Sequence, residues 1–400
     1  MAGRKAVLRV AIRAFEPFES GIRKAWELFD ATAQTGLTLD IGAFDLHGLH
    51  KTLFENGGLG DGTWDIAFLS TDWAPEAAAS GGLTDLAELL RASPPEGFPE
   101  AWPDSLLGMQ NVNGRVIGLP FHDGPECLIY RKDFFEGGRA VPETWDEFHE
   151  AARQLHGAEE NLSGAIFGAF PDGHNTVYDF CLQLWSRGGE LFDGAGELRL
   201  NTAAAREGLA FYRGMLRDRQ AVHPRCLELD SIEAGLAFAR GEGALTVNWF
   251  GFAAMCETTA DSRVKGKVGV ARVPRGADRT AGRHVSLNAY WILGIGAATP
   301  HAEIAWQFLR HCATPAMDKM VTLGGAIGCR KSTWRDAEVN ARIPFYRELE
   351  RFHEDARELP RFERWPQVAA ALDELMVDAV RTDIPEAALL ERAEKKIAMA

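Results

Sequence analysis

The alternation of strand and helix patterns over the first hundred residues constrains the fold more than any other feature. A short apolar run at 7–12 has the composition of a strand that is covered on both faces, and further strands are expected at 37–41 and 65–69. Between the first two lies a helical stripe, which Ser20 is placed to cap and Gly36 to end. Strands that alternate with helices in this way pair in parallel, because the connecting helix returns the chain to the same edge. The beginning of the chain therefore predicts an α/β domain.

The middle of the chain starts a second unit with the same kinds of elements. Further strands are expected at 116–120, 128–130, 244–248, 268–273 and 290–295. Further helices are expected at 176–187, 203–219, 231–240 and 299–312, and over most of the chain from 335 onward. Thr144 and Glu147 have the spacing of a capping box, which predicts another helix start. A chain of 400 residues is too long for one ordinary core, so we expect two α/β domains.

Composition and charge exclude several classes of protein. The chain is 46% hydrophobic and 25% charged without low-complexity tracts, which argues against disorder and coiled coil. No apolar run reaches the length needed to cross a bilayer. The formal net charge is −14, which makes nucleic acid a poor partner. A neutral, zwitterionic or cationic small ligand fits this balance better.

Catalytic and metal-binding signatures are missing from the sequence. The P-loop, HExxH, GxSxG and kinase motifs do not occur, and the Gly294–Gly296 segment lacks the third glycine of a dinucleotide site. His47 and His50 fit solvated residues near a helix end better than metal ligands. Six cysteines at irregular spacings form no CxxC pair, so neither a disulfide scaffold nor a zinc site is predicted. We expect no enzymatic activity, no metal and no cofactor.

Loops at one edge of the predicted sheets repeatedly combine aromatic and acidic residues. Open α/β sheets bind ligands at the carboxyl ends of their strands. The candidate residues of these loops are Phe15, Glu16, Asp72, Trp73, His122, Asp123, Trp249, Phe250, Asn288 and Tyr290. Aromatic rings cover the apolar face of a sugar, and carboxylates accept hydrogen bonds from its hydroxyls. The alternative interpretation is that the rings belong to the core and the acids to solvated turns.

Trp249 and Phe250 follow a short strand directly. Successive side chains at the exit of a strand point to opposite faces, so both rings do not fit into one core. We expect Trp249 to stack on the ligand and Phe250 to pack inward.

Several segments resemble, in order, the blocks of the extracellular solute-binding proteins of family 1. This is the maltose-binding-protein-like family of ABC sugar importers. The first block is GTWDIAFLSTDW at 62–73, which is followed by SGGLTDL at 80–86. The later blocks are NGRVIGLP at 113–120, LIYRKD at 128–133, VPETWDEF at 141–148, GGELF at 188–192, FARGEGAL at 238–245 and AEIAWQFL at 302–309.

The resemblance implies a class II-like periplasmic-binding-protein fold. Two α/β lobes would be joined by crossing hinge strands and would hold one ligand in the cleft between them. Lobe one would comprise 1–122 plus 292–335, and lobe two 123–291 plus 336–400. The ligand would be a sugar or polyol, and the partners the permease and ATPase subunits of an ABC importer. The protein would act as a monomer that closes about its hinge.

The resemblance also implies site residues and a location. Phe15 and Glu16 match the loop after the first strand, and Asp72 and Trp73 the loop after the third. In lobe two, the matching residues are His174, Asn175, Trp249, Phe250 and Trp365. The family is secreted or lipid-anchored, so the protein is expected in the periplasm, with its signal peptide outside this sequence. The six cysteines and the missing lipobox leave a cytoplasmic protein as the alternative.

Other functions stay open on the sequence alone. One is a glycosidase-like enzyme that uses two of the carboxylates in the cleft. Another is a ligand-loaded partner of a sensor. An acidic or phosphorylated ligand would need cations such as Arg330, Arg361 and Arg364, for which surface salt bridges are the simpler interpretation.

Overall fold

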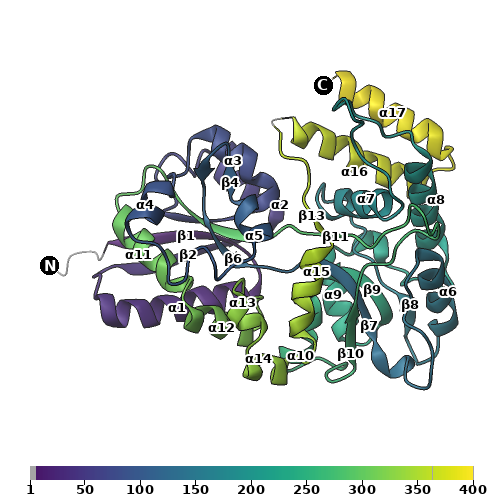
Figure 1. Ribbon diagram of the computed structural model, residues 1–400, viewed down its shortest axis with the longest axis horizontal. Helices are drawn as coiled ribbons and strands as arrows, with labels where there is room; N and C mark the ends of the chain where they lie inside the picture. Colours follow the sequence, from purple (N-terminus) through teal and green to yellow (C-terminus); the bar gives the residue numbers. More distant parts are fainter. Residues whose placement is uncertain (1–5, 363, 400) are drawn as a thin grey trace. The chain divides into compact units, whose positions relative to one another are not determined.

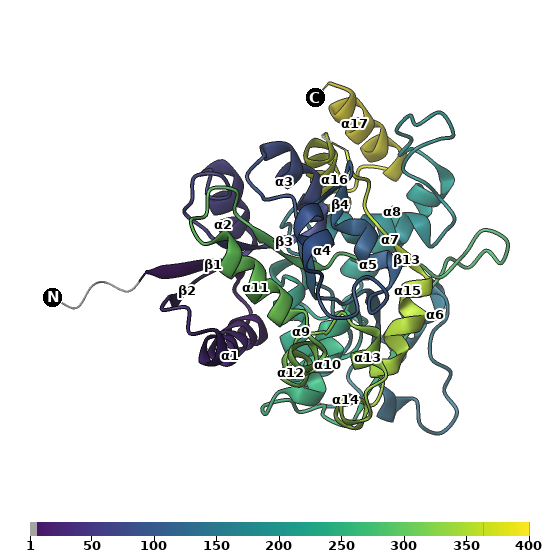
Figure 2. The ribbon, with the colours of Figure 1, turned by 60° about the vertical axis from the view of Figure 1, so that its left-hand side comes forward.

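The computed structural model describes residues 6–362 and 364–399 (Figures 1 and 2). The chain forms two compact units. Unit 1 comprises Met1–Gly124 and Ala289–Glu350, and unit 2 comprises Pro125–Asn288 and Arg351–Ala400. The chain therefore passes three times from one unit to the other.

Unit 1 is built on a five-stranded sheet in the order β2-β1-β3-β12-β6. Its strands are β1 (Val7–Arg13), β2 (Thr38–Phe44), β3 (Ile66–Ser70), β6 (Leu119–His122) and β12 (Trp291–Ile295). The strands β1, β2 and β3 pair in parallel, as the sequence predicts. In contrast, β12 runs antiparallel to both β3 and β6. The start of β12 therefore lies at the same edge as the ends of β3 and β6.

The helices of unit 1 come from both of its chain segments. They are α1 (Glu16–Ala33), α2 (Leu46–His50), α3 (Ala74–Ser80), α4 (Ala87–Ala92), α5 (Asp104–Met109), α11 (Ala302–Cys312), α12 (Pro315–Leu323), α13 (Lys331–Trp334) and α14 (Ala337–Arg342). Shorter elements are η1 (Lys51–Glu55), η2 (Thr71–Trp73), η5 (Tyr346–Glu348) and the hairpin strands β4 (Asn111–Val112) and β5 (Arg115–Val116). Helix α1 packs against α11 through Trp26, Phe29 and Phe308, whose ring centroids lie 5.2 to 5.6 Å apart.

Helix α1 begins earlier than the sequence predicts. Phe15 is its N-cap, and Ser20 lies inside the helix instead of capping it. Pro17 is tolerated in the first turn because the N–H that it lacks has no partner within the helix there. Glu16 and Glu19 add negative charge at the positive end of the helix dipole.

Unit 2 is built on a four-stranded sheet in the order β10-β7-β9-β8. Its strands are β7 (Glu126–Arg131), β8 (Ser163–Ala165), β9 (Gly243–Trp249) and β10 (Val268–Ala271). Strand β7 is antiparallel to β9 and β10, whereas β8 is parallel to β9. A second, two-stranded sheet pairs β11 (Ser286–Leu287) with β13 (Ala356–Arg357).

The helices of unit 2 surround these sheets. They are α6 (Trp145–Leu155), α7 (Asn175–Trp185), α8 (Ala203–Arg217), α9 (Ser231–Ala239), α10 (Phe250–Thr258), α16 (Trp365–Arg381) and α17 (Glu386–Met399). Short 3-10 turns are η3 (Lys132–Phe134) and η4 (Cys226–Glu228), and α15 (Leu349–Glu354) crosses the boundary between the units. Figures 1 and 2 both show α17 beside α16 at the C-terminal end.

Of two helices in unit 2, α6 and α10, the sequence predicts the first and misses the second. The capping box of α6 is confirmed, because Thr144 accepts a hydrogen bond from the backbone of Glu147 and the Glu147 side chain returns one. Helix α10, in contrast, is not among the helices that the sequence predicts. Every residue of α10 from Phe250 to Glu257 is buried, so the sequence shows no one-sided apolar stripe.

Residues 336–350 belong to unit 1, whereas the resemblance implies lobe two. Tyr346 explains this difference. Its ring is fully buried, and its Oη accepts a hydrogen bond from the backbone N–H of Gly328 at 2.9 Å. Thr322 in α12 lies 3.4 Å from the same hydroxyl. These contacts attach the segment to the core of unit 1.

Candidate functional site

The edge of the unit 1 sheet gathers aromatic side chains from four strand ends. Phe15 follows β1, Trp73 follows β3, His122 ends β6 and Trp291 begins β12. All four are partly exposed. The buried ring of Phe18 lies among them, with centroid distances of 5.1 Å to Phe15, 4.7 Å to His122 and 6.0 Å to Trp291. This edge is therefore a wall of half-exposed rings.

Trp73 links this wall to further rings that the sequence analysis did not select. Its centroid lies 5.9 Å from Trp291, 5.2 Å from His50 and 6.1 Å from Phe54. His50 was expected to be solvated, but its Nε2 contacts a carboxylate oxygen of Glu76 at 2.9 Å. Phe54 lies in the π-helical turn η1, a rare geometry that is frequent at functional sites. Trp291 was missed because it is the first residue of a strand.

His122 supplies a polar atom at this edge. Its Nδ1 accepts a hydrogen bond from the backbone N–H of Ile327 at 2.8 Å. Burial lowers the pKa of His122 to about 3, although the neighbouring Asp123 acts in the opposite direction. The neutral ring therefore carries its proton on Nε2, which makes that atom a hydrogen-bond donor. Asp123 is fully buried, and its own N–H donates to the Ile327 carbonyl.

The acidic candidates of unit 1 differ in exposure. Asp72 is half-buried in the short turn η2, directly before α3. The N-cap of α3 is Trp73, whose side chain makes no capping hydrogen bond. Glu16 is exposed in the first turn of α1.

In unit 2, three of the predicted residues meet at the end of β9. The half-buried indole of Trp249 donates from Nε1 to Oδ1 of Asn175 at 3.2 Å, and its ring stands perpendicular to Tyr178 at 5.4 Å. The hydroxyl of Tyr178 lies 3.0 Å from Nδ1 of His174, the N-cap of α7. Asn175 in turn donates from its side chain to Asp172 at 2.5 Å. The first turn of α7 thus positions the ring of Trp249.

Glu126 is a further member of this group that the sequence analysis missed. It begins β7 directly opposite Trp249 in the β7–β9 ladder, so both side chains leave the same face of the sheet. Glu126 is 4% exposed, and its Oε2 has no hydrogen-bond partner among the residues that the structure describes. Burial, and secondarily the charge of Asp179, raise the pKa of Glu126 well above its ordinary value.

Asp179 and Asn288 are two further buried polar residues of unit 2. Burial raises the pKa of Asp179 to about 7, against a hydrogen bond from the Tyr212 hydroxyl at 3.1 Å. Asn288 is 2% exposed, and within the described ranges neither polar atom of its side chain has a partner. Buried polar atoms are normally hydrogen-bonded. Glu126 and Asn288 therefore mark places where a ligand or ordered water completes the bonding.

Three predicted aromatic residues are buried within the units. Phe250 is fully buried in unit 2 with its ring 6.0 Å from Phe352. Tyr290 is fully buried in unit 1, where its hydroxyl donates to the carbonyl of Leu106. Trp365 is buried at the start of α16. Rings covered in this way are not available to stack on a ligand, so we leave them out of the candidate site.

The three arginines considered for an anionic ligand make their contacts within their own units. Arg330 is buried, donates to the carbonyls of Glu96 and Ala313, and lies 4.5 Å above the ring of Trp102. Arg361 pairs with Glu358 at 3.0 Å, and Arg364 donates to the carbonyl of Ile397. These contacts favour the structural interpretation over anion binding.

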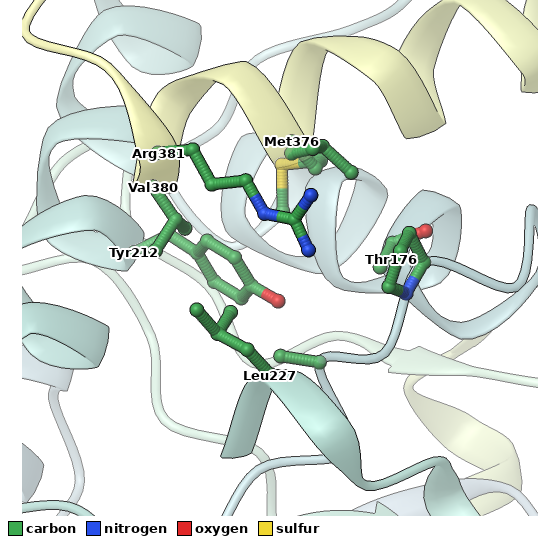
Figure 3. Close-up of a pocket in the computed structure, with 9 residues that line it drawn as sticks. Thr176, Tyr212, Leu227, Met376, Val380 and Arg381 are labelled. Carbon is green, nitrogen blue, oxygen red and sulfur yellow. The ribbon is translucent and has the colours of Figure 1, made fainter. Parts of the chain in front are cut away.

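A separate small cavity in unit 2 is lined by residues of α7, α8 and α16, among others (Figure 3). Figure 3 shows Tyr212, Met376 and Arg381 around it. Its volume is about 10 Å³, which is about what one water molecule needs. It is too small for a sugar. The six cysteines, all of them among the described residues, are buried and form no disulfide.

Among the residues that the structure describes, no three metal-ligating side chains cluster in a way that could hold a metal ion. None of the described helices is long and apolar enough to cross a membrane.

Comparison with solved structures shows the same fold over nearly the whole chain. A maltose-bound protein of T. maritima superposes with a TM-score of 0.89 at 22% identity, covering 98% of this chain and 99% of that one. A solute-binding protein of an ABC transporter from Agrobacterium radiobacter K84, in complex with ribitol, gives a TM-score of 0.88 at 23% identity and covers 98% of both chains. The fold is thus the two-lobed α/β fold of periplasmic sugar-binding proteins.

Sequence comparison finds curated relatives and a family. A binding protein of Brucella abortus is 25% identical over 206 residues, which cover 50% of this chain and 47% of that protein. The arabinooligosaccharide-binding protein of Bacillus subtilis is 23% identical over 236 residues, which cover 57% of this chain and 50% of that protein. The chain spans about half the length of the curated relatives it matches. The family model of bacterial extracellular solute-binding proteins matches residues 49–319. The chain belongs to the bacterial extracellular solute-binding protein family.

Proposed function

We propose that this protein is the substrate-binding component of an ABC importer and that its ligand is a carbohydrate or a polyol. The observation that carries the proposal is the pairing of half-exposed rings with polar groups in each unit, as in Trp249 with Asn175 and Trp73 with His50. Rings of this kind cover the apolar face of a sugar, and the polar atoms bind its hydroxyls. The maltose and ribitol complexes of the similar structures support the same ligand class.

The proposed ligand contacts come from both units. In unit 1 they are Phe15, Glu16, Asp72, Trp73, His122, Asp123 and Trp291, and in unit 2 they are Glu126, His174, Asn175, Trp249 and Asn288. A ligand that is bound by both units favours the conformation in which both can reach it. Binding would therefore close the protein about the three chain connections, and this closed form would be recognised by the permease.

The finer parts of the proposal concern what the protein does not do and where it works. We propose that it acts as a monomer in the periplasm and performs no chemistry on its ligand. Membership of an extracellular solute-binding family supports this location and role. A glycosidase would need two carboxylates placed on either side of the scissile bond. The alternative is therefore tested by looking for cleavage products after prolonged incubation with oligosaccharides.

A thermal-shift screen against monosaccharides, oligosaccharides and polyols tests the proposed function. A ligand at one hundred times its dissociation constant stabilises the folded state by about 2.7 kcal/mol, which raises the melting temperature measurably. We expect a shift with at least one sugar or polyol and an unchanged ligand in chromatography afterwards. A screen in which no member of these classes shifts the melting temperature would contradict the proposal. Cleavage of the ligand would establish the enzyme alternative.

A further inference from the structure

Three acidic side chains of unit 2 lie on the elements that hold Trp249 or directly before them: Glu126 in β7, Asp172 before α7 and Asp179 in α7. Within residues 6–362 and 364–399, no lysine, arginine or histidine side chain forms an ion pair with any of them. Among these described residues, Asp172 accepts hydrogen bonds from the backbone of His174 and from the backbone and side chain of Asn175, Asp179 accepts from Tyr212, and Oε2 of Glu126 has no partner. These partners are neutral.

Burial and neighbouring carboxyl groups disfavour the ionised forms of two of these groups. The charge of Asp179 raises the pKa of Glu126, and the charge of Asp172 raises that of Asp179, in each case in addition to burial. Carboxylates that are brought together without a cation destabilise each other, and a bound cation removes that penalty.

Two basic side chains of this part of unit 2, Arg357 and His174, already have other partners. Arg357 influences the same buried thiol, Cys181, as Glu126 does. Its guanidinium, however, forms a two-point ion pair with Glu190 at 3.0 and 2.6 Å and lies 4.3 Å above the ring of Trp185. His174 shares its Nδ1 with the hydroxyl of Tyr178. The positive charge that the cluster lacks is therefore not supplied by these side chains.

The remaining walls of the cluster suit a cation. Trp249 is half-buried with Tyr178 at its edge, and tryptophan and tyrosine faces attract ammonium groups. Asn288 follows Ser286, whose hydroxyl donates to the backbone carbonyl of Glu126, and both polar atoms of its buried amide lack partners among the described residues. A hydroxyl group would meet one need of this site, a hydrogen bond to Glu126, but not the other, a positive charge that stabilises the ionised carboxylate. An ammonium group would satisfy both.

On the basis of the function proposed above, we propose that the ligand group held by unit 2 carries a positive charge, an ammonium as in an amino sugar or amino polyol, with Glu126 as its counter-ion. The negative net charge of the chain, −14, also attracts a cationic ligand over a distance.

Isothermal titration calorimetry at pH 7 with matched probes tests this inference. Each pair differs only by amines in place of hydroxyls, one amine in 1-amino-1-deoxy-D-sorbitol against D-sorbitol and in D-glucosamine against D-glucose, and two in the β-1,4-linked glucosamine dimer against cellobiose. In any pair that binds, we expect the amine to bind at least tenfold more tightly. A neutral member that binds as tightly as its amine would overturn the inference.

The variant Glu126→Gln tests whether this one side chain causes the preference for the amine, because it removes the charge and keeps the shape. We expect the ratio of amine to neutral affinity to fall at least tenfold. The matched control is Glu160→Gln, an exposed glutamate of the same unit, which should leave the ratio as it is. If Glu126→Gln does not fold, Asp179→Asn serves as the second variant and should also lower the ratio. An unchanged ratio in the folded variant would show that Glu126 is not the counter-ion.

The screen separates the failure of this inference from that of the proposed function. If neutral sugars or polyols bind and none of the three amines does, the inference is wrong and the proposed function stands. If no sugar, polyol or amine binds, both are wrong.

Discussion

The two units offer different chemistry at their candidate edges. In unit 1, half-exposed rings predominate, and the polar atom beside them belongs to a neutral histidine, His122. In unit 2, a single half-exposed indole, Trp249, stands beside buried acidic groups whose hydrogen bonding is incomplete. We expect the two units to have different roles in ligand binding. Unit 1 would supply the contact area that most sugars can use, and unit 2 would select among them.

The two units also differ in how completely their buried carboxyl groups are hydrogen-bonded. The largest predicted effect follows from this difference. Asp318 in unit 1 accepts hydrogen bonds from the backbone of Cys329 and Arg330 and from the Thr333 hydroxyl. Asp318→Ala leaves these donors unpaired, so we expect the free energy of unfolding to fall by about 3 kcal/mol. Glu126→Gln should change it by less than about 1 kcal/mol, because no partner is lost. Urea denaturation without ligand measures both, and similar losses would contradict the contrast.

Asp72 tests the polar part of unit 1. If its carboxylate accepts hydroxyl hydrogen bonds from the ligand, Asp72→Ala should weaken binding by about 1.5–3 kcal/mol, the scale of a charged hydrogen bond. Stability without ligand should hardly change. Titration of the sugar or polyol found in the screen measures the affinity, and urea denaturation supplies the control. An equal loss of ligand-free stability would show that Asp72 is structural.

Trp249 tests the aromatic part of unit 2. Trp249→Ala should cost about 2 kcal/mol in affinity, as central aromatic anchors do. It should also remove most of the change in tryptophan fluorescence on binding. The chain contains eleven tryptophans, so the comparison with Trp249→Phe, which keeps an aromatic face, decides the assignment. Normal binding and a full fluorescence response in Trp249→Ala would move the platform to Trp73 or Trp291.

A smaller effect concerns the pH dependence of stability, which has opposite signs in the two units. The pKa of Asp179 is raised to about 7, so its unfolded form loses the proton first and stability falls as pH rises from about 4 to 7. The pKa of His122 is lowered to about 3, so its unfolded form gains the proton first and stability falls as pH drops from about 6.5 to 3.

Variants at the two positions separate these contributions. The two contributions oppose each other between about pH 4 and 6.5. In that range Asp179→Asn should leave a stability that rises with pH, and His122→Gln a stability that falls with pH. Denaturation curves from pH 4 to 8 measure both. Parallel profiles for the wild type and both variants would show that neither group is coupled to folding in the way its surroundings indicate.

The local patterns of the sequence were sufficient for much of the fold. The apolar runs of β1 and β3 and the capping box at Thr144 depend on neighbouring residues, and the structure contains all of them. Helix α10 was missed because its residues are buried on every side, which removes the helical periodicity. Residues 336–350 were assigned to the other lobe because a contact such as that of Tyr346 with Gly328 leaves no local pattern.

The candidate site was harder to predict than the fold. Trp249 carried a local signal as an aromatic residue at a strand end, whereas Asn175 was selected only through the family resemblance. Glu126 and Trp291 were missed. Each begins a strand, and its place at the edge follows from pairing with residues distant in sequence, Trp249 for the first and His122 for the second. Burial of Phe250 agrees with the expected split between adjacent rings, although which ring meets the ligand is still a prediction.

Small-angle X-ray scattering with and without ligand tests the central claim most directly, namely that one ligand is bound by both units. The probe is the sugar or polyol that gives the largest thermal shift. Closure moves whole units, so the account predicts that the radius of gyration falls when this ligand is added at saturation. A non-binding sugar from the same screen should leave the profile as it is. An unchanged radius of gyration at saturating ligand would contradict the account.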